Sequence, residues 1–249
     1  MRIAVAGATG TVGRHVVEVA RERGHRVVLL SRRAGHDVTS GDVSAALGGV
    51  DVIVDVLGIQ TLSRRRATRF FEAASETLHR SGARAGVSHL VALSIVGIDG
   101  VDSAYYGAKL AHERAVAAGA LPFTLLRAAQ FHEFAQQTIS RGSLGPVVVV
   151  PAALVRPVAA REVADELVRR AEGAPLGRVR DLVGPRDEVL VEMVRAVLAH
   201  RGSSRASIPF ALPGRMGRAM VSGQLRGTDD ARRGTTTFSE WLRSADAAR

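Results

Sequence analysis

The stretch GATGTVG, residues 7–13, constrains the fold of this chain more than any other feature. It follows RIAVAG, a short apolar run that predicts a buried strand, and it opens TVGRHVVEVARERGH, whose apolar residues recur at helical spacing. Gly7 allows a sharp turn, Gly10 lets a pyrophosphate approach the backbone, and Gly13 lets the helix pack closely on the strand. Because the glycines stand between a strand and a helix, they predict a dinucleotide-binding loop rather than a turn without a ligand.

Hydrogen-bond donors around this loop suit an anionic ligand. Thr9 and Thr11 can add hydroxyl groups, and the helix N-terminus supplies unpaired N–H groups at the positive end of its dipole. The residues predicted to hold the phosphates are Gly7, Thr9, Gly10, Thr11, Val12 and Gly13.

Strands and helices alternate through the first half of the chain. Further apolar runs predict strands at RVVLLS, VDVIVDVLG, VSHLVALSIVG and PFTLLRAAQ, with helical patterns after the second and third of these. The alternation predicts an α/β fold of the Rossmann type, a doubly wound parallel sheet with helices on both faces. After Gln130 the pattern loosens. We therefore expect a dinucleotide-binding core over residues 1–130, and later strands plus a small C-terminal substrate lobe over 131–249, in one compact unit.

Composition excludes several classes of function. The 249 residues include no cysteine, which excludes disulfides and thiol catalysis, and no histidine pair has metal-ligand spacing, so no metal is predicted. The formal charge is +10, but the arginines are spread thinly and aromatic residues make up 4%, so a field that attracts an anionic cofactor is favoured over nucleic-acid binding. We see no secretory signal and no membrane-spanning run, and we expect a cytoplasmic protein without a membrane partner.

The end of the second predicted strand indicates which dinucleotide binds. An acidic residue there would hold the adenosine ribose 2′-hydroxyl of NAD. This chain has LLSRRAG instead, and Ser31, Arg32 and Arg33 can donate hydrogen bonds to a 2′-phosphate. The alternative is a solvated basic turn. The sequence therefore predicts NADP (as NADPH) in preference to NAD.

Lys109 is the only lysine in a chain whose lysines and arginines total 34. On a helix, Tyr105 lies four positions before it on the same face, and Tyr106, three positions before, is the rival. A nearby ammonium lowers the pKa of a phenol and can bond to a nicotinamide ribose, whereas the broad plane of an arginine cannot take the same position. We predict a proton-exchanging tyrosine assisted by Lys109; the alternative is a lysine retained by chance on a helix surface.

GATGTVG followed by YYGAK resembles the short-chain dehydrogenase/reductase superfamily, which combines a glycine-rich loop with Tyr-x-x-x-Lys. LSIVGID, YYGAKLAHERAV, LPFTLLRAAQFHEF and VRPVAAREVADEL are similar to the atypical, NmrA-like branch of NAD(P)-binding proteins, and the resemblance runs through most of the chain. The asparagine that many members carry on the fourth helix is not evident in FFEAASETLHRSG, which weakens the implied proton relay.

The resemblance implies roles by position. Ser94 falls on the carbonyl-polarising serine, Tyr105 on the acid/base tyrosine and Lys109 on the lysine, which also binds the cofactor. The stretches implied to contact the cofactor are Asp37 and Val38 at the adenine, and Val56, Leu57 and Gly58 beside the dinucleotide.

Three functions are compatible with these residues. The first is an NADP-dependent oxidoreductase that transfers hydride between NADPH and a carbonyl or quinone-type small molecule, with help from Ser94, Tyr105 and Lys109. The second is an NADP-binding sensor or regulator without catalysis, as the resemblance to NmrA-like proteins allows. The third is a nucleotide-sugar epimerase or dehydratase, which SRR and the modest C-terminal part argue against.

Three further features of the C-terminal half carry predictions. His132, in QFHEF just past a predicted strand, contacts the substrate or donates a second proton; the alternative is a loop histidine with a local hydrogen bond. GRMGRAMVSG is predicted to be a lobe loop rather than a second phosphate site, because no strand is predicted before it. Phe238 and Trp241 are predicted to anchor the last helix to the core.

Overall fold

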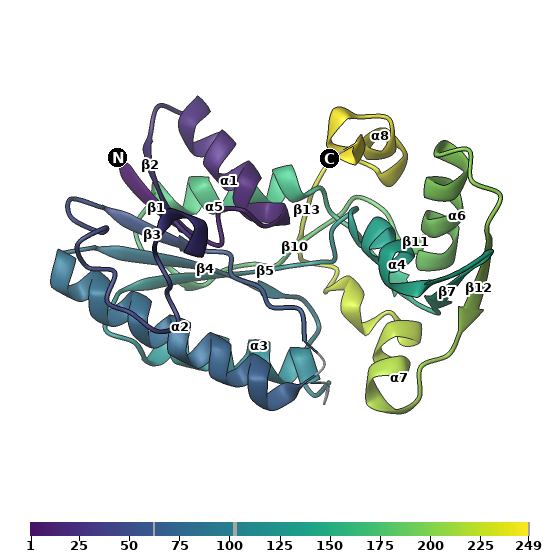
Figure 1. Cartoon of the computed structure of the whole chain (residues 1–249), viewed down its shortest axis with the longest axis horizontal. Helices are drawn as coiled ribbons and strands as arrows, with labels where there is room; N and C mark the ends of the chain where they lie inside the picture. The colour runs from purple at the N-terminus through teal and green to yellow at the C-terminus, as the bar shows by residue number, and fades with distance from the viewer. Residues whose placement is uncertain (62, 102–103, 249) are drawn as a thin grey trace. The chain divides into compact units, whose positions relative to one another are not determined.

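The apolar runs of the N-terminal half form the parallel sheet predicted from them. In the computed structural model, which describes residues 1–61, 63–101 and 104–248, these strands lie in the order β5-β4-β3-β1-β2 (Figure 1). Their bounds are Arg2–Ala6 (β1), Arg26–Leu30 (β2), Val52–Asp55 (β3), His89–Ile95 (β4) and Phe123–Ala128 (β5). In register, Ala4 pairs in parallel with Val28 of β2 and with Ile53 of β3. Strands β1, β3 and β4 are almost wholly buried, which is why their sequences are continuous apolar runs.

The chain divides into two compact units, each assembled from separate stretches. The first unit comprises Met1–Ile95, Ser103–Arg127 and Arg161–Arg180; the second comprises Val96–Asp102, Ala128–Ala160 and Asp181–Arg249. The sequence had suggested a single unit with a change of character at residue 130. In the structure, residues 161–180 return to the first unit, and residues 96–102 belong to the second.

Helices flank both faces of the first unit's sheet (Figure 1). Their bounds are Thr11–Glu22 (α1), Arg64–Ala85 (α2), Ala104–Ala118 (α3) and Ala160–Ala171 (α5), with a short 3₁₀ turn at Arg32–Ala34 and a short strand, Gly177–Arg178 (β9), beside β5. Ser63 starts α2 by accepting a hydrogen bond from the Arg66 amide, and Gly86 ends it in the left-handed conformation. The predicted Rossmann-type α/β fold is confirmed by this arrangement.

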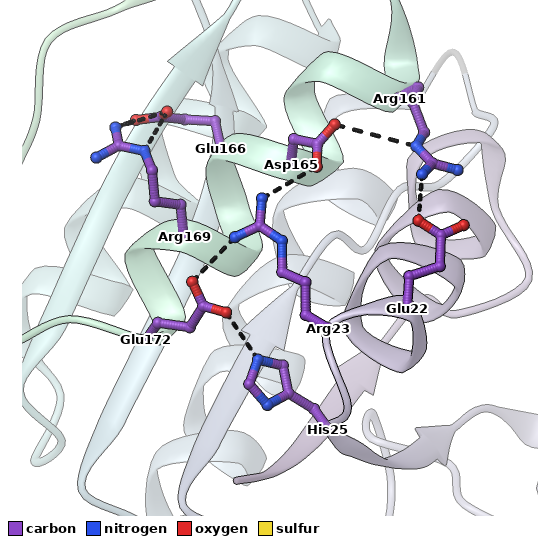
Figure 2. Close-up of polar contacts among 8 residues, drawn as sticks. All are labelled: Glu22, Arg23, His25, Arg161, Asp165, Glu166, Arg169 and Glu172. Atoms are coloured by element: carbon purple, nitrogen blue, oxygen red, sulfur yellow. Dashed lines mark hydrogen bonds and ion pairs between the residues drawn. The ribbon is translucent and has the colours of Figure 1, made fainter.

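Helix α5 is tied to the end of α1 by ion pairs that span about 140 residues of sequence (Figure 2). Arg23 donates to Asp165 at 3.1 Å and to Glu172 at 2.9 Å, and Arg161 donates to Glu22. These pairs are partly exposed, so each contributes about 0–1 kcal/mol, which is less than the burial of the apolar residues of α5 contributes.

The second unit consists of short elements. Its helices and 3₁₀ turns are Phe134–Gly142 (α4), Leu190–His200 (α6), Gly214–Ser222 (α7), Gln224–Arg226 (η2), Phe238–Leu242 (α8) and Ala245–Ala248 (η3). Its strands are Ser143–Leu144 (β6), Val147–Pro151 (β7), Leu154–Val155 (β8), Leu182–Val183 (β10), Glu188–Val189 (β11), Ala206–Phe210 (β12) and Arg232–Arg233 (β13). Strand β12 runs parallel to β7, and β13 runs parallel to β10.

The prediction of a loop at GRMGRAMVSG is wrong. Gly214–Ser222 forms helix α7, and strand β12 precedes it. The glycines misled the prediction because they reduce helix propensity, yet Ala219 and Met220 bury one face of the helix and Gly223 ends it in the left-handed conformation.

The predicted anchoring of the last helix is confirmed. Phe238 and Trp241 are buried and stack with ring centroids 5.6 Å apart, and Thr237 and Glu240 form a capping box at the start of α8.

Two structural features relate to the membrane and metal classes of function. Within the described stretches, no helix combines the length and the apolarity needed to cross a membrane. Over the same residues, no three histidine, aspartate or glutamate side chains gather as a metal site would require, and the expectation that the protein needs no metal stays a prediction.

Candidate active site

The glycine-rich loop connects β1 to α1 through contacts that only glycine permits. Gly7 has φ +87°, and a Cβ on it would lie 2.8 Å from the Val56 carbonyl oxygen. A Cβ on Gly13 would lie 2.0 Å from the Gly7 carbonyl oxygen. The loop, the first turn of α1 and the turn after β3 therefore meet backbone to backbone, as expected for a loop that approaches a diphosphate.

The start of α1 fits an anionic group. Gly10 is the N-cap and provides no side-chain cap, and the first turn of α1 contains no acidic residue. The positive end of the helix dipole is therefore not neutralised from within the helix. Thr9 is exposed beside it, Thr11 is half-buried, and the Val12 side chain is buried, so Val12 can contribute only its backbone to a ligand.

Gly13→Ala is expected to weaken binding of NAD(P)H by about 10-fold or more, because the new methyl group forces the Gly7 peptide out of position. The dissociation constant can be measured by nicotinamide fluorescence. Gly48→Ala is the matched control, since a Cβ at that position would meet the Ala45 carbonyl oxygen at an ordinary 3.5 Å. Equal affinities in both variants would contradict the role assigned to the loop.

The basic turn after β2 presents its arginines to solvent. Arg32 and Arg33 are exposed, and the Ser31 hydroxyl accepts a hydrogen bond from the Ala34 amide at 3.3 Å. Asp37 accepts hydrogen bonds from the Thr39 hydroxyl at 2.6 Å and the Thr39 amide at 2.9 Å, which hold its pKa below the usual range.

Val38, the other residue implied at the adenine, has its side chain buried in the core around Leu30 and Val43. A ligand at this position would therefore meet the backbone of Val38 rather than its side chain.

The turn after β3 brings Tyr105 beside the residues expected to line the cofactor. The Val56 amide donates to the Ala6 carbonyl at 3.0 Å, which joins this turn to the end of β1. Gly58 is exposed, and a Cβ built on it would lie 3.6 Å from the Tyr105 hydroxyl. Leu57, which stands between Val56 and Gly58 in the sequence, is half-buried, and its amide donates to the Asp55 carboxylate at 3.0 Å. The structure thus places the predicted phenol at the predicted cofactor turn.

Tyr105 and Lys109 share the face of α3 that packs against Phe71 of α2. The Tyr105 and Phe71 ring centroids are 6.0 Å apart, and the Lys109 Nζ lies 4.6 Å above the Phe71 ring. The Tyr106 ring is half-buried, 6.4 Å from that of Tyr105.

Lys109 is buried, with 4% of its surface exposed, so the alternative of a lysine on a helix surface is wrong. Its ammonium donates to the Leu93 carbonyl at 2.8 Å and to His112 Nδ1 at 3.1 Å. Burial lowers its pKa to about 8, against the opposing fields of Asp55 and Glu113.

Ser94 lies next to Leu93 near the end of β4 and is buried. Its hydroxyl has no hydrogen-bond partner within the part of the chain that the structure describes. A buried hydroxyl without a partner is costly unless a ligand or water satisfies it, so this orphan group fits a residue that binds a substrate oxygen.

Two residues of this region were missed by the sequence interpretation. His112 is fully buried on α3, and its Nε2 lies 2.9 Å from Oδ2 of Asp55, which is fully buried at the end of β3. A signal was present in both cases. Asp55 interrupts the apolar run VDVIVDVLG, and His112 follows Lys109 by three positions on a helix.

His132 lies in the second unit and has no exposed surface. Its Nε2 donates to the Thr236 carbonyl at 3.0 Å, and its ring packs 5.7 Å from Phe238 and 5.6 Å from Trp241. This hydrogen bond joins residues 104 positions apart, so it differs from the local bond of the alternative, and a role of His132 toward the substrate stays a prediction.

A protein-family model covers the part of the sequence that contains most of the residues described above. A family model described as NAD(P)H-binding matches residues 7–169. The match begins at Gly7 and includes Ser94, Tyr105 and Lys109. No protein with a curated description matches the chain.

Solved structures share the fold at low sequence identity. A dTDP-4-dehydrorhamnose reductase from Clostridium acetobutylicum ATCC 824 aligns with TM-score 0.69 and 14% identity over 91% of this chain and 95% of that one. A short-chain dehydrogenase/reductase superfamily protein from Agrobacterium tumefaciens with bound NAD gives 0.68 and 15% over 100% and 97%. A Citrobacter sp. triphenylmethane reductase complexed with NADP(H) gives 0.63 and 17% over 92% and 93%. At these identities the likeness establishes the fold.

Proposed function

The chain belongs to the NAD(P)H-binding family, and we propose that it is an NADP-dependent oxidoreductase that transfers hydride between NADPH and a carbonyl or quinone-type small molecule. One observation carries the proposal. The Tyr105 hydroxyl lies beside the Gly58 turn, and the buried Lys109 is one helical turn away on the same face. A phenol and an ammonium in this relation suit proton transfer at neutral pH.

The first unit offers a continuous series of groups for the dinucleotide. The loop from Gly7 to Gly13 and the start of α1 would hold the pyrophosphate, and the turn at Val56, Leu57 and Gly58 would line the nicotinamide half. Ser31, Arg32 and Arg33 would donate to the 2′-phosphate, with Asp37 and Val38 near the adenine. The bound cofactor supplies the hydride.

Three side chains would act on the substrate oxygen. The Ser94 hydroxyl would donate a hydrogen bond to the carbonyl oxygen as negative charge develops, and Tyr105 would deliver the proton. Lys109 would favour the phenolate form of Tyr105 by its charge. An ammonium has three N–H donors, and two of those on Lys109 have partners among the described residues, so the third is the one assigned to a cofactor ribose.

The test is oxidation of NADPH, followed at the nicotinamide absorbance band, against a panel of ketones and quinones. Turnover of at least one compound class by the wild-type protein supports the reductase. NADPH binding without turnover of any compound favours the sensor, and tight NAD binding with interconversion of a nucleotide sugar favours an epimerase.

Arg33→Ala and Arg32→Ala are expected to weaken NADPH binding by about 10- to 100-fold each, because a charge-assisted hydrogen bond contributes about 1.5–3 kcal/mol. NADH binding should change little, since NADH has no 2′-phosphate. Dissociation constants for both cofactors measure this directly. Arg21→Ala, which removes an arginine from the last turn of α1, is the control. Tighter binding of NADH than NADPH to the wild-type protein would reverse the preference.

A further inference from the structure

A buried polar chain extends from Lys109 into the interior of the first unit. The Lys109 ammonium meets His112 Nδ1 at 3.1 Å, and His112 Nε2 meets Asp55 Oδ2 at 2.9 Å. Asp55 Oδ1 accepts the Leu57 amide at 3.0 Å, so both carboxylate oxygens are occupied. His112 and Asp55 have no exposed surface.

With a neutral His112, the donors and acceptors of this buried polar chain are mutually consistent. A carboxylate only accepts hydrogen bonds, so His112 Nε2 carries the proton that Asp55 receives. His112 Nδ1 then has a lone pair, which accepts from the Lys109 ammonium. The arrangement is an anionic Asp55, a neutral His112 and a cationic Lys109, and its net charge is zero, as a low-dielectric interior requires.

The electrostatic surroundings of Asp55 and His112 agree with this arrangement. Burial raises the pKa of Asp55, but His112 and Lys109 outweigh it and leave that pKa below the usual range. Burial, followed by the charge of Lys109, lowers the pKa of His112 and keeps it neutral.

Other ionisable groups pack around the chain from neighbouring elements. Glu113 on α3 is bound by Arg127 of β5 at 2.6 and 2.7 Å, so its charge is already compensated. His79 on α2 has its pKa lowered by burial, and its Nδ1 accepts the Leu121 amide at 3.1 Å. Asp55 therefore provides the carboxylate that balances Lys109.

We propose that Asp55 and His112 are positioning residues, which hold the Lys109 ammonium charged and fixed one helical turn from Tyr105. The buried polar chain from Lys109 to Asp55 does not conduct protons to solvent, because it ends at the fully buried Asp55 and the Leu57 amide. It acts as a clamp: His112 sets where the amine lies, and Asp55 keeps it charged. The inference rests on the proposed function in taking Tyr105 as the proton donor.

The clamp can be tested on Lys109 alone, because protein made with [13C]lysine carries one labelled side chain. The 13Cε shift is followed against pH without cofactor or substrate. The wild-type midpoint is expected near the pKa of about 8. Asp55→Asn should lower it by about one unit or more, because the negative charge is lost and an NH2 group, which only donates, replaces one of the two oxygens that accept from Leu57 and His112.

Two variants at His112 distinguish the loss of its hydrogen bonds from the loss of its side-chain volume. His112→Gln keeps one acceptor and one donor and should leave the lysine midpoint near its wild-type value. His112→Leu removes both and should lower it. Glu166→Gln is the control, since it also removes a buried carboxylate from the first unit, where Glu166 is bound to Arg169 and Arg170, and should not move the lysine signal.

Kinetics give the second measurement. On the proposed function, Asp55→Asn lowers kcat about 10-fold, as expected for losing part of an acid–base effect. A lysine midpoint that neither folded Asp55→Asn nor folded His112→Leu changes would overturn the clamp. An inactive wild-type protein whose lysine behaves as described supports the clamp and counts against the proposed reaction.

Discussion

Tyr105→Phe is expected to lower kcat for NADPH-dependent reduction by about 10²- to 10⁴-fold, the range over which a positioned acid or base accelerates a reaction. The substitution removes the hydroxyl beside Gly58 and keeps the ring that packs on Phe71, so the fold should be retained. The dissociation constant for NADPH should change by less than about 10-fold, because the phenol acts on the substrate oxygen. Steady-state kinetics and cofactor titration of the same preparation give both numbers.

Tyr106→Phe is the matched control for this prediction. It removes an identical hydroxyl from the adjacent position of the same helix, where the ring is also half-buried. Activity of Tyr106→Phe should stay close to wild type. If the two variants lose activity in the opposite order, Tyr106 is the proton donor and the site must be assigned again.

Trp241→Ala is expected to lower the free energy of unfolding of the second unit by about 3–5 kcal/mol. The indole is 2% exposed and stacks on Phe238, so its removal leaves a cavity that short helix α8 has few means of filling. Urea denaturation monitored by circular dichroism measures the change, and the midpoint of the transition assigned to the second unit is the quantity to compare.

Val221→Ala is the control for the stability measurement. Val221 is an apolar residue of α7 with 55% of its surface exposed, so its truncation should cost less than about 0.5 kcal/mol. Trp241→Phe should fall between the two. It keeps an aromatic ring and deletes an Nε1 that has no hydrogen-bond partner among the described residues. A Trp241→Ala loss no larger than that of Val221→Ala would contradict the anchoring role.

The N-terminal loop and the strands around it were predictable because the information is local. The spacing of Gly7, Gly10 and Gly13 reports how closely one backbone segment must approach another, and the structure contains those approaches. Continuous apolar runs similarly report strands that are buried on both faces. The pairing of Tyr105 with Lys109 on one face follows from the helical repeat alone.

Other features depended on residues that are far apart in the chain. Asp55 and His112 are separated by 57 positions, and Arg23 is separated from Glu172 by 149. Neither partner of such a pair carries a local signal of the other. The same limit explains the return of residues 161–180 to the first unit and the helix at Gly214–Ser222, whose buried face outweighs its glycine content.

The sequence by itself determined the glycine-rich loop between a strand and a helix, the α/β class and the placing of Tyr105 and Lys109 on one helical face, because these depend on backbone sterics and on periods of two or 3.6 residues. Only the tertiary structure decided that Lys109 is buried, that His112 and Asp55 continue from it, and that His132 is bonded inside the second unit. The physical reason is that the charge and hydrogen bonding of a buried group depend on which side chains the topology brings within about 3 Å.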